Sequence, residues 1–178
     1  MISEKTMTVN VAKWLKSKKG LAAREISVGG NRFDVVAYDK KRRVFKVVEC
    51  KLAKRKTSVG KTFGQLVSYT DALSRSGYDF VNRASQKLGQ LDFNTWMEAT
   101  SGGKKIRVEC FVALRAEALK DFDFLQSIRK QVPYVGIIRY KKNGECRNDL
   151  LIKGKHNSTL SRAKMFTIRL QKPEQQPH

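Results

Sequence analysis

One segment constrains the fold of this chain more than any other, residues 31–51 with the sequence NRFDVVAYDKKRRVFKVVECK. Two runs rich in β-branched and aromatic residues, at about 32–39 and 43–50, flank a short basic turn that begins at Asp39. The pattern predicts two adjacent β-strands joined by a tight turn. We therefore expect the chain to build a sheet that contains this strand pair.

Three charged side chains fall at one end of the strand pair. Asp34 is the last polar residue at the start of the first strand, and Glu49 and Lys51 lie at the end of the second. Side chains alternate along a strand, so Glu49 and Lys51 share one face and Cys50 faces away. Two carboxylates and an ammonium are thus expected to project from the same end of the sheet.

The rest of the chain alternates between helical and strand patterns. The expected elements are, in order, a helix at 3–18, a strand at 21–28, the strand pair, a helix at 61–75, an irregular insertion with short helices at 76–105, a strand at 106–114, a helix at 116–130, a strand at 134–140, a hairpin turn at 142–144, a strand through about 152 and one more strand near 165–170.

This order is typical of an α/β fold, with a mixed sheet covered by helices on both faces. At 178 residues the chain is long enough for one domain with a sizeable core. We expect that single domain to span 1–170, with a disordered tail at 171–178.

The charge of the chain indicates its partner. Lys and Arg number 37 against 16 Asp and Glu, which gives a formal net charge of +21. Such a surplus attracts polyanions, and phosphate contacts gain further from counterion release, so DNA is the expected partner and RNA the alternative. The chain has no strongly amphipathic basic helix, no lipidation signal and no apolar run near 18 residues, which argues against a membrane partner.

The cysteines indicate the compartment. Cys50, Cys110 and Cys146 are odd in number and widely spaced, and no CxxC pair occurs. This spacing argues against a disulfide framework and against a zinc site. We therefore expect a soluble protein in a reducing, intracellular compartment, the cytoplasm.

Carboxylates beside phosphates predict a metal-assisted reaction. Hydrolysis of a phosphodiester needs a divalent ion that neutralises developing charge and lowers the pKa of a water. Mg²⁺ (or Mn²⁺) takes oxygen ligands and often only one or two protein carboxylates, which Asp34 and Glu49 would supply. The backbone carbonyl of Cys50 is a further candidate ligand. The ammonium of Lys51 would orient the attacking water or stabilise the pentavalent phosphate.

Asp34 followed by Glu49-Cys50-Lys51 resembles the D…ExK signature of the PD-(D/E)xK nuclease superfamily, although Phe33 stands where that signature often has proline. The resemblance implies a restriction-endonuclease-like mixed β-sheet core in the order αβββαβ, flanked by helices, with extra C-terminal strands. It also implies that the two acids bind Mg²⁺ and that the lysine assists the water.

Two neighbouring segments extend the resemblance. Glu4 on the first helix is similar to the additional metal-binding acid of archaeal Holliday-junction resolvases. A first-turn acid favoured by the helix dipole is the other interpretation of Glu4, and Glu25 is the alternative third acid. Gln65 and Tyr69 resemble the Q-x-x-x-Y motif of the RecB and lambda-exonuclease branch. Being i and i+4, they share one helical face, from which an amide and a phenol would contact the phosphate or nearby waters.

Residues 40–61 hold ten Lys and Arg and a single acid. A solvated charge run is the plain interpretation, but this run brackets the proposed metal ligands in the sequence. Contacts with phosphates, which position a duplex without reading its sequence, are expected from Lys40, Lys41, Arg42, Arg43, Lys54, Arg55, Lys56 and Lys61.

Two other motifs lack a residue that their chemistry would need. A second VEC occurs at 108–110, but Phe111 follows where a lysine would be needed, so Glu109 is expected to be a strand residue on the solvent or DNA side. Gly60 begins a GKT sequence, but Arg55 stands where a phosphate-binding loop needs glycine.

The sequence thus predicts a Mg²⁺-dependent deoxyribonuclease of the structure-selective or repair and recombination type. Two alternatives stay open. One is a DNA- or RNA-binding protein that keeps the nuclease fold without catalysis, and the other is a basic RNA-binding or ribosome-associated protein in which Asp34 and Glu49 are incidental. A homodimer would suit paired incisions, although no interface is evident from the sequence.

Overall fold

The computed structural model describes residues 2–18, 20–52, 56–89, 105–115, 135–147, 151–152, 155–156 and 165–169. Its elements are α1 (Glu4–Ser17), β1 (Leu21–Val28), β2 (Asn31–Asp39), β3 (Val44–Lys51), α2 (Lys56–Arg75), α3 (Gly77–Leu88), β4 (Lys105–Arg115), β5 (Val135–Tyr140), β6 (Cys146–Arg147), β7 (Leu151–Ile152), β8 (Lys155–His156) and β9 (Phe166–Arg169).

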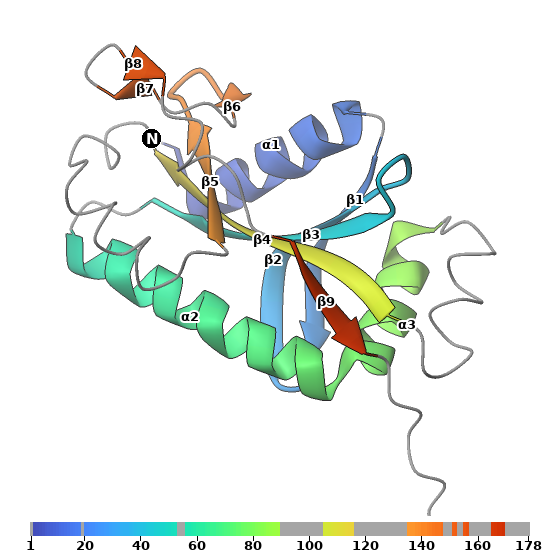
Figure 1. Ribbon diagram of the computed structural model, residues 1–178. Helices are drawn as coiled ribbons and strands as arrows, with labels where there is room; N and C mark the ends of the chain where they lie inside the picture. The colour runs from blue at the N-terminus through green and yellow to red at the C-terminus, as the bar shows by residue number, and fades with distance from the viewer. Residues whose placement is uncertain are drawn as a thin grey trace, which may run out of the picture.

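Seven strands form one mixed sheet in the order β1-β2-β3-β4-β5-β6, with β9 also paired to β4 (Figure 1). The strands β1, β2 and β3 are antiparallel neighbours, whereas β4 runs parallel to both β3 and β5. One edge of β4 pairs with β3, and the other edge is divided between β9 and β5. The predicted α/β class with a mixed sheet is therefore confirmed.

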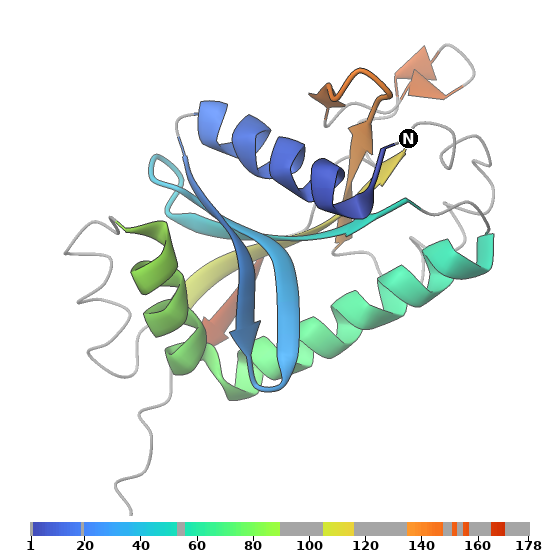
Figure 2. The same ribbon diagram turned by 180° about the vertical axis from the view of Figure 1, so that it is seen from behind.

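Helices cover both faces of the sheet, and each face has its own hydrophobic core (Figures 1 and 2). The α2-side core, under α2 and α3, includes Phe33, Phe45, Leu66, Leu73 and Phe80. The α1-side core includes Met7, Val11, Leu15, Val35, Val48 and Cys50. Among the described residues, no helix is both long enough and apolar enough to cross a bilayer.

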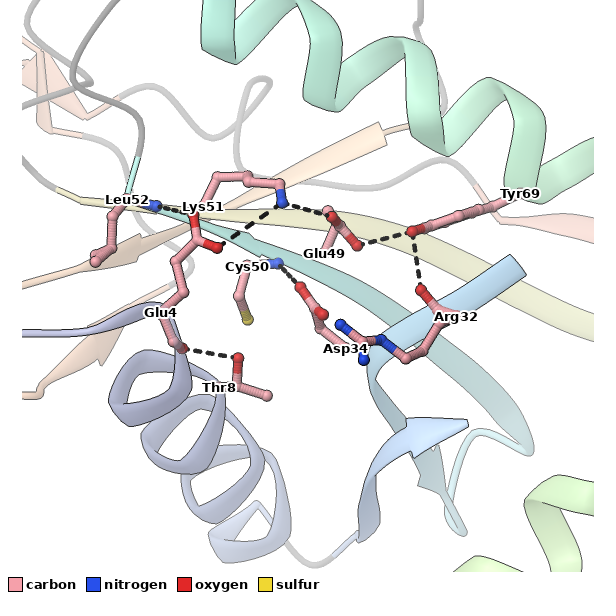
Figure 3. Close-up of polar contacts among 9 residues, drawn as sticks. All are labelled: Glu4, Thr8, Arg32, Asp34, Glu49, Cys50, Lys51, Leu52 and Tyr69. Atoms are coloured by element: carbon pink, nitrogen blue, oxygen red, sulfur yellow. Dashed lines mark hydrogen bonds and ion pairs between the residues drawn. The ribbon is translucent and has the colours of Figure 1, made fainter. Parts of the chain in front are cut away.

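The first helix forms as its sequence predicts. Ser3 caps it, with a side-chain oxygen that accepts a hydrogen bond from the Thr6 amide at 3.0 Å. Met7, Val11 and Leu15 are buried at spacings of four residues, which is one face of a helix. This face packs on the sheet, so the beginning of α1 lies next to the end of β3 (Figure 3).

The observed bounds differ from the predicted ones at a few places. The helix expected at 61–75 begins five residues earlier, at Lys56, and includes Gly60 in its interior. The strand expected through 152 is short: β6 ends at Arg147, and β7 pairs with β8 in a separate two-stranded sheet. The additional strand near 165–170 is confirmed as β9.

The expected insertion at 76–105 begins with α3, whose Phe80, Val81 and Ala84 are fully buried in the α2-side core. The part from 90 to 104 lies outside the described residues, as do the expected helix at 116–130 and the expected tail at 171–178.

The pairing of β1 with β2 is interrupted at one position. Residues on either side pair as Arg24 with Val35 and Ile26 with Phe33, but Glu25 has a left-handed backbone with φ 55°. Val35 packs in the α1-side core and Phe33 in the α2-side core, although residues two apart on a regular strand share one face. The β1–β2 hairpin therefore twists at Asp34, the residue between them.

Candidate active site

Asp34 and Glu49 lie on adjacent strands, one position beyond the Val35–Val48 pair where the β2–β3 ladder ends. Oδ2 of Asp34 accepts a hydrogen bond from the Cys50 amide at 2.8 Å (Figure 3). The side chain thus pairs with a backbone N–H that lies beyond the ladder. This bond fixes the Asp34 carboxylate beside the end of β3.

Glu49 is a buried carboxylate, only 3% exposed, on the α2 side of the sheet. Its Oε1 lies 3.3 Å from Nζ of Lys51, and its Oε2 lies 3.0 Å from the Tyr69 hydroxyl. Burial raises the pKa of Glu49, and the charge of Asp34 raises it further against the opposing effects of Lys51 and Tyr69. An ionised Glu49 is therefore held at a cost in this site.

The Tyr69 hydroxyl joins two strands. Its oxygen is 3.0 Å from Oε2 of Glu49 and 2.9 Å from the Arg32 carbonyl oxygen, and its ring packs edge-on against Phe33 with centroids 4.7 Å apart. A hydroxyl has one proton and cannot donate fully to two acceptors. Its one proton is therefore shared between the Glu49 carboxylate and the Arg32 carbonyl. Burial raises the pKa of Tyr69, which keeps it a neutral phenol.

Lys51 is half-buried between two carboxylates. Its Nζ lies 3.3 Å from Oε1 of Glu49 and 3.9 Å from Oε2 of Glu4. Burial works against the charged ammonium, but the charges of Glu49 and Glu4 outweigh it and raise the pKa of Lys51. Lys51 is thus a fixed positive charge at the mouth of the site.

Glu4 lies in the first turn of α1 and also faces the end of β3. Its Oε1 accepts a hydrogen bond from the Leu52 amide at 3.3 Å, and its other oxygen pairs with Lys51. Glu4 is therefore both an acid in the first turn of a helix and an acid directed at the site, because the first turn of α1 lies at the end of β3. Glu25, the alternative third acid, is exposed on β1 and does not line the cleft that Asp34 and Glu49 line.

These side chains line a cleft of about 350 Å³. Its lining consists of Glu4, Gly30, Asn31, Arg32, Asp34, Glu49, Lys51, Gln65, Ser68 and Tyr69. Every acid, lysine, amide and phenol singled out in the D…ExK and Q-x-x-x-Y motifs is in that set. The sequence did not identify Gly30, Asn31, Arg32 and Ser68 as residues of the cleft. The first three lie just before Asp34 in the chain, and that position is the signal that could have identified them.

The basic turn of the hairpin lies away from the cleft. Asp34 is near the start of β2, whereas Lys40, Lys41, Arg42 and Arg43 follow its end. These four residues are exposed, and none of them lines the cleft. Proximity in the sequence to the proposed metal ligands therefore does not place the turn beside them.

Arg42 has a structural partner. Its guanidinium makes two hydrogen bonds, of 2.6 and 3.1 Å, to the carboxylate of Glu109. Glu109 is buried on β4, which corrects its expected place on the solvent or DNA side. The pairing satisfies a carboxylate that the sheet would otherwise bury alone.

The remaining basic candidates lie on or before α2. Lys61 is exposed on α2 and does not line the cleft. Lys54 and Arg55 lie outside the described residues, and Lys56 is described only as the first residue of α2.

The oxygen donors of the site suit a small divalent cation. Within the described ranges, no group of three or more His, Cys, Asp or Glu side chains is close enough to share a metal. A metal-binding role for Glu4 stays a prediction. Mg²⁺ requires only one or two protein carboxylates and keeps several waters. Asp34 and Glu49 meet that requirement. A bound cation would also offset the cost of burying an ionised Glu49 carboxylate.

Cys50 could offer its backbone carbonyl to a metal ion, whereas its thiol faces away from the site. The thiol lies in the α1-side core, where burial raises its pKa well above the usual range. The amide points toward Asp34. The N–H and C=O of one strand residue face the same neighbouring strand, so the Cys50 carbonyl is a third oxygen on that side.

No protein-family model, curated protein or solved structure matches this chain.

Proposed function

We propose that this protein is a divalent-metal-dependent deoxyribonuclease with a restriction-endonuclease-like core, related in kind to the PD-(D/E)xK nucleases. It would hydrolyse DNA phosphodiester bonds and act on branched or otherwise structured DNA in repair or recombination. The observation that carries the proposal is the buried Glu49 carboxylate beside Asp34, with Lys51 3.3 Å away in the same cleft.

This arrangement costs stability without serving the fold. A buried carboxylate is expensive unless it is paired and hydrogen-bonded, and a second carboxylate beside it adds to that expense. Glu49 forms its hydrogen bond with Tyr69 where both residues line the cleft. Such costs are typical of sites where a ligand supplies the missing charge.

The order of elements also supports the proposal. A helix, three antiparallel strands and a second helix precede a strand that is parallel to the third. The acids lie on the second and third strands, and Gln65 and Tyr69 lie on the helix that follows. The resemblance to the PD-(D/E)xK nucleases assigns the acids and the glutamine–tyrosine pair to these elements.

Asp34, Glu49 and the Cys50 carbonyl would hold the Mg²⁺ or Mn²⁺ ion. When bound, that ion would neutralise charge on the phosphate and lower the pKa of a water. Lys51, kept protonated by its carboxylate neighbours, would orient the attacking water and stabilise negative charge on the phosphate.

Two residues of α2 would support these groups. Tyr69, as a neutral phenol, would hold the Glu49 carboxylate in one orientation. Gln65, exposed at the cleft, would donate a hydrogen bond from its side-chain amide to a phosphate oxygen. The formal charge of +21 would bring DNA to the surface in the first place.

A DNA- or RNA-binding protein that keeps this fold without catalysis is the second candidate. The observation in its favour is that Lys51 pairs with both Glu49 and Glu4, so its ammonium has carboxylate partners already. Under this alternative the protein binds polynucleotides and leaves them intact.

The test is cleavage of a panel of labelled duplex, flap, junction and single-stranded DNA with Mg²⁺ or Mn²⁺. The wild-type protein is expected to cut at least one member, and Glu49→Gln and Lys51→Ala are expected to lose cutting by ~100-fold or more while binding survives. Glu109→Gln is the matched control, a buried glutamate outside the cleft. Binding of the whole panel without any cutting would favour the second candidate.

A further inference from the structure

Arg32 is a cation of the cleft for which the described part of the chain holds no carboxylate partner. Its side chain is exposed on β2 and lines the cleft two residues before Asp34. Among the described residues, no carboxylate forms a salt bridge with its guanidinium, whereas Lys51 has two. The charge of Arg32 therefore stays available to something that enters the cleft.

The backbone of Arg32 is held by a hydrogen bond, whereas its guanidinium pairs with none of the described carboxylates. Its carbonyl oxygen accepts a hydrogen bond from the Tyr69 hydroxyl at 2.9 Å, and that hydroxyl also contacts Glu49. One oxygen atom thus ties the position of Arg32 to that of the buried carboxylate. Because no described carboxylate pairs with the guanidinium, Arg32 can turn its charged end toward a ligand without breaking an ion pair, while its backbone keeps its place.

The hairpin tip before Arg32 leaves the cleft open. Gly29 and Gly30 both have positive φ, 54° and 78°, which is the backbone of a two-residue hairpin turn. Gly30 lines the cleft, and a Cβ built on it would meet no atom within 4 Å. A polymeric ligand can therefore pass over this turn and reach Arg32.

Arg32 and Lys51 lie on opposite sides of the acid pair. Figure 3 shows Lys51 beyond Glu49 on one side and Arg32 beside Asp34 on the other. A phosphate held at the acids would have Lys51 next to it, and Arg32 would lie in the direction of the hairpin tip. The planar guanidinium offers two parallel N–H donors that match phosphate oxygens.

We propose that Arg32 binds the phosphodiester next to the scissile one on the same strand. The substrate class is then a polynucleotide that presents at least two consecutive phosphodiesters across the cleft, and not a mononucleotide or an isolated phosphodiester. This inference rests on the proposed nuclease function. It assigns Arg32 to substrate binding and gives it no part in bond breaking.

The first measurement is metal-free binding of a fluorescent 20-base-pair duplex and of the corresponding single strand, in a Glu49→Gln background that cannot cut. Adding Arg32→Ala is expected to weaken binding about 10–100-fold, the value of one or two charge-assisted hydrogen bonds. It should also lower the slope of log affinity against log salt by about one. Arg32→Lys should recover only part of the loss.

Arg24→Ala is the matched control, because Arg24 is an exposed arginine on the neighbouring strand β1 that does not line the cleft. Binding by Arg32→Ala that equals binding by Arg24→Ala would overturn the inference. A loss confined to Arg32→Ala would uphold it.

The second measurement separates this inference from the proposed function. In the cutting protein, Arg32→Ala is expected to raise KM for DNA about 10–100-fold with little change in kcat. Hydrolysis of bis(4-nitrophenyl) phosphate, which has one phosphodiester and no neighbour, should match that of Arg24→Ala. If the wild-type protein cuts nothing, the nuclease proposal fails, and the binding comparison alone decides the role of Arg32. If DNA is cut and Arg32→Ala has normal KM, the role of Arg32 fails and the nuclease stands.

Discussion

The hydroxyl oxygen of Tyr69 lies 3.0 Å from Oε2 of Glu49, a carboxylate with 3% of its surface exposed. This contact connects a helix to the end of a strand at the floor of the cleft. It also links the stability of the fold to the protonation state of one acid.

The first prediction concerns the pH dependence of stability. An acid whose pKa is raised on folding stabilises the folded state fully below its ordinary value, 4.5 for Glu49, and loses this contribution as pH rises through the raised value. Glu49→Gln removes the titration and keeps the shape. Thermal unfolding without metal should show it melting about 2–4 °C above wild type at pH 8, which is ~1 kcal/mol, and level with wild type near pH 4.

Glu109→Gln provides the comparison, because Glu109 is a buried glutamate paired with Arg42. It should gain nothing at pH 8. A Glu49→Gln protein that melts below wild type across the whole pH range would contradict the explanation.

The second prediction separates the Tyr69 hydroxyl from its ring. Tyr69→Phe keeps the edge-on contact with Phe33 but leaves Glu49 and the Arg32 carbonyl without their donor. It should cost about 1–2 kcal/mol of unfolding free energy and reduce cleavage as well. Tyr140→Phe is the control, a buried tyrosine whose hydroxyl accepts from Asn10 at 2.8 Å away from the cleft. It should lose comparable stability and keep its cleavage rate.

The third prediction is a metal-dependent rise in melting temperature. A ligand that binds only the folded state stabilises it by about 2.7 kcal/mol at a hundred times its dissociation constant. Mg²⁺ or Mn²⁺ should therefore raise the melting temperature of the wild-type protein, and Asp34→Asn should abolish the rise. Asp39→Asn, on the same strand but paired with Lys46, should respond as wild type does. An equal shift in all three proteins would place the metal elsewhere.

The fourth prediction concerns the left-handed backbone of Glu25, at φ 55°. A residue with a side chain pays about 1–2 kcal/mol in this conformation, and glycine does not. Glu25→Gly should raise the unfolding free energy by about 0.5–1 kcal/mol, after glycine's greater loss of chain entropy is counted. Glu25→Ala should give no gain in chemical denaturation. Equal effects of the two changes would mean that the backbone conformation is not the cause.

The fifth prediction assigns Arg42 to stability. Its guanidinium is half exposed while the Glu109 carboxylate is buried, so Arg42→Ala leaves an acid without its partner. We expect a loss of about 1–3 kcal/mol, below the range for a fully buried pair, and unchanged DNA affinity apart from the loss of one charge. Lys41→Ala, next to it on the exposed turn, should keep its stability. Stable Arg42→Ala protein with sharply weaker DNA binding would restore the phosphate-contact interpretation.

The elements around the cleft could be read from the sequence because their signals are local. The strands that carry Asp34 and Glu49 have alternating and β-branched residues, and the observed bounds of β2 and β3 fall within one residue of the predicted ones. The face that Glu49 and Lys51 share follows from a period of two, and that of Gln65 and Tyr69 from a spacing of four. These regularities need no knowledge of distant contacts.

The features that the sequence did not predict depend on distant or irregular contacts. Arg42 pairs with a residue 67 positions away, and the run of basic residues around Arg42 gives no sign of that partner. Arg32 follows a Gly-Gly-Asn turn, and its place in the cleft depends on the twist at Asp34 and on Tyr69. The sequence placed the start of α2 at 61, but the helix begins at Lys56 and tolerates Gly60 at about 1 kcal/mol relative to alanine.

The divided edge of β4 has a consequence for biosynthesis. Lys105–Val108 pairs on that edge with β9, whose residues follow about sixty positions later in the chain. During translation this half of β4 emerges first and presents unpaired backbone groups until β9 leaves the ribosome. Such an edge invites association with other nascent chains. The order of synthesis therefore leaves this stretch of the sheet without its partner strand while about sixty further residues are made.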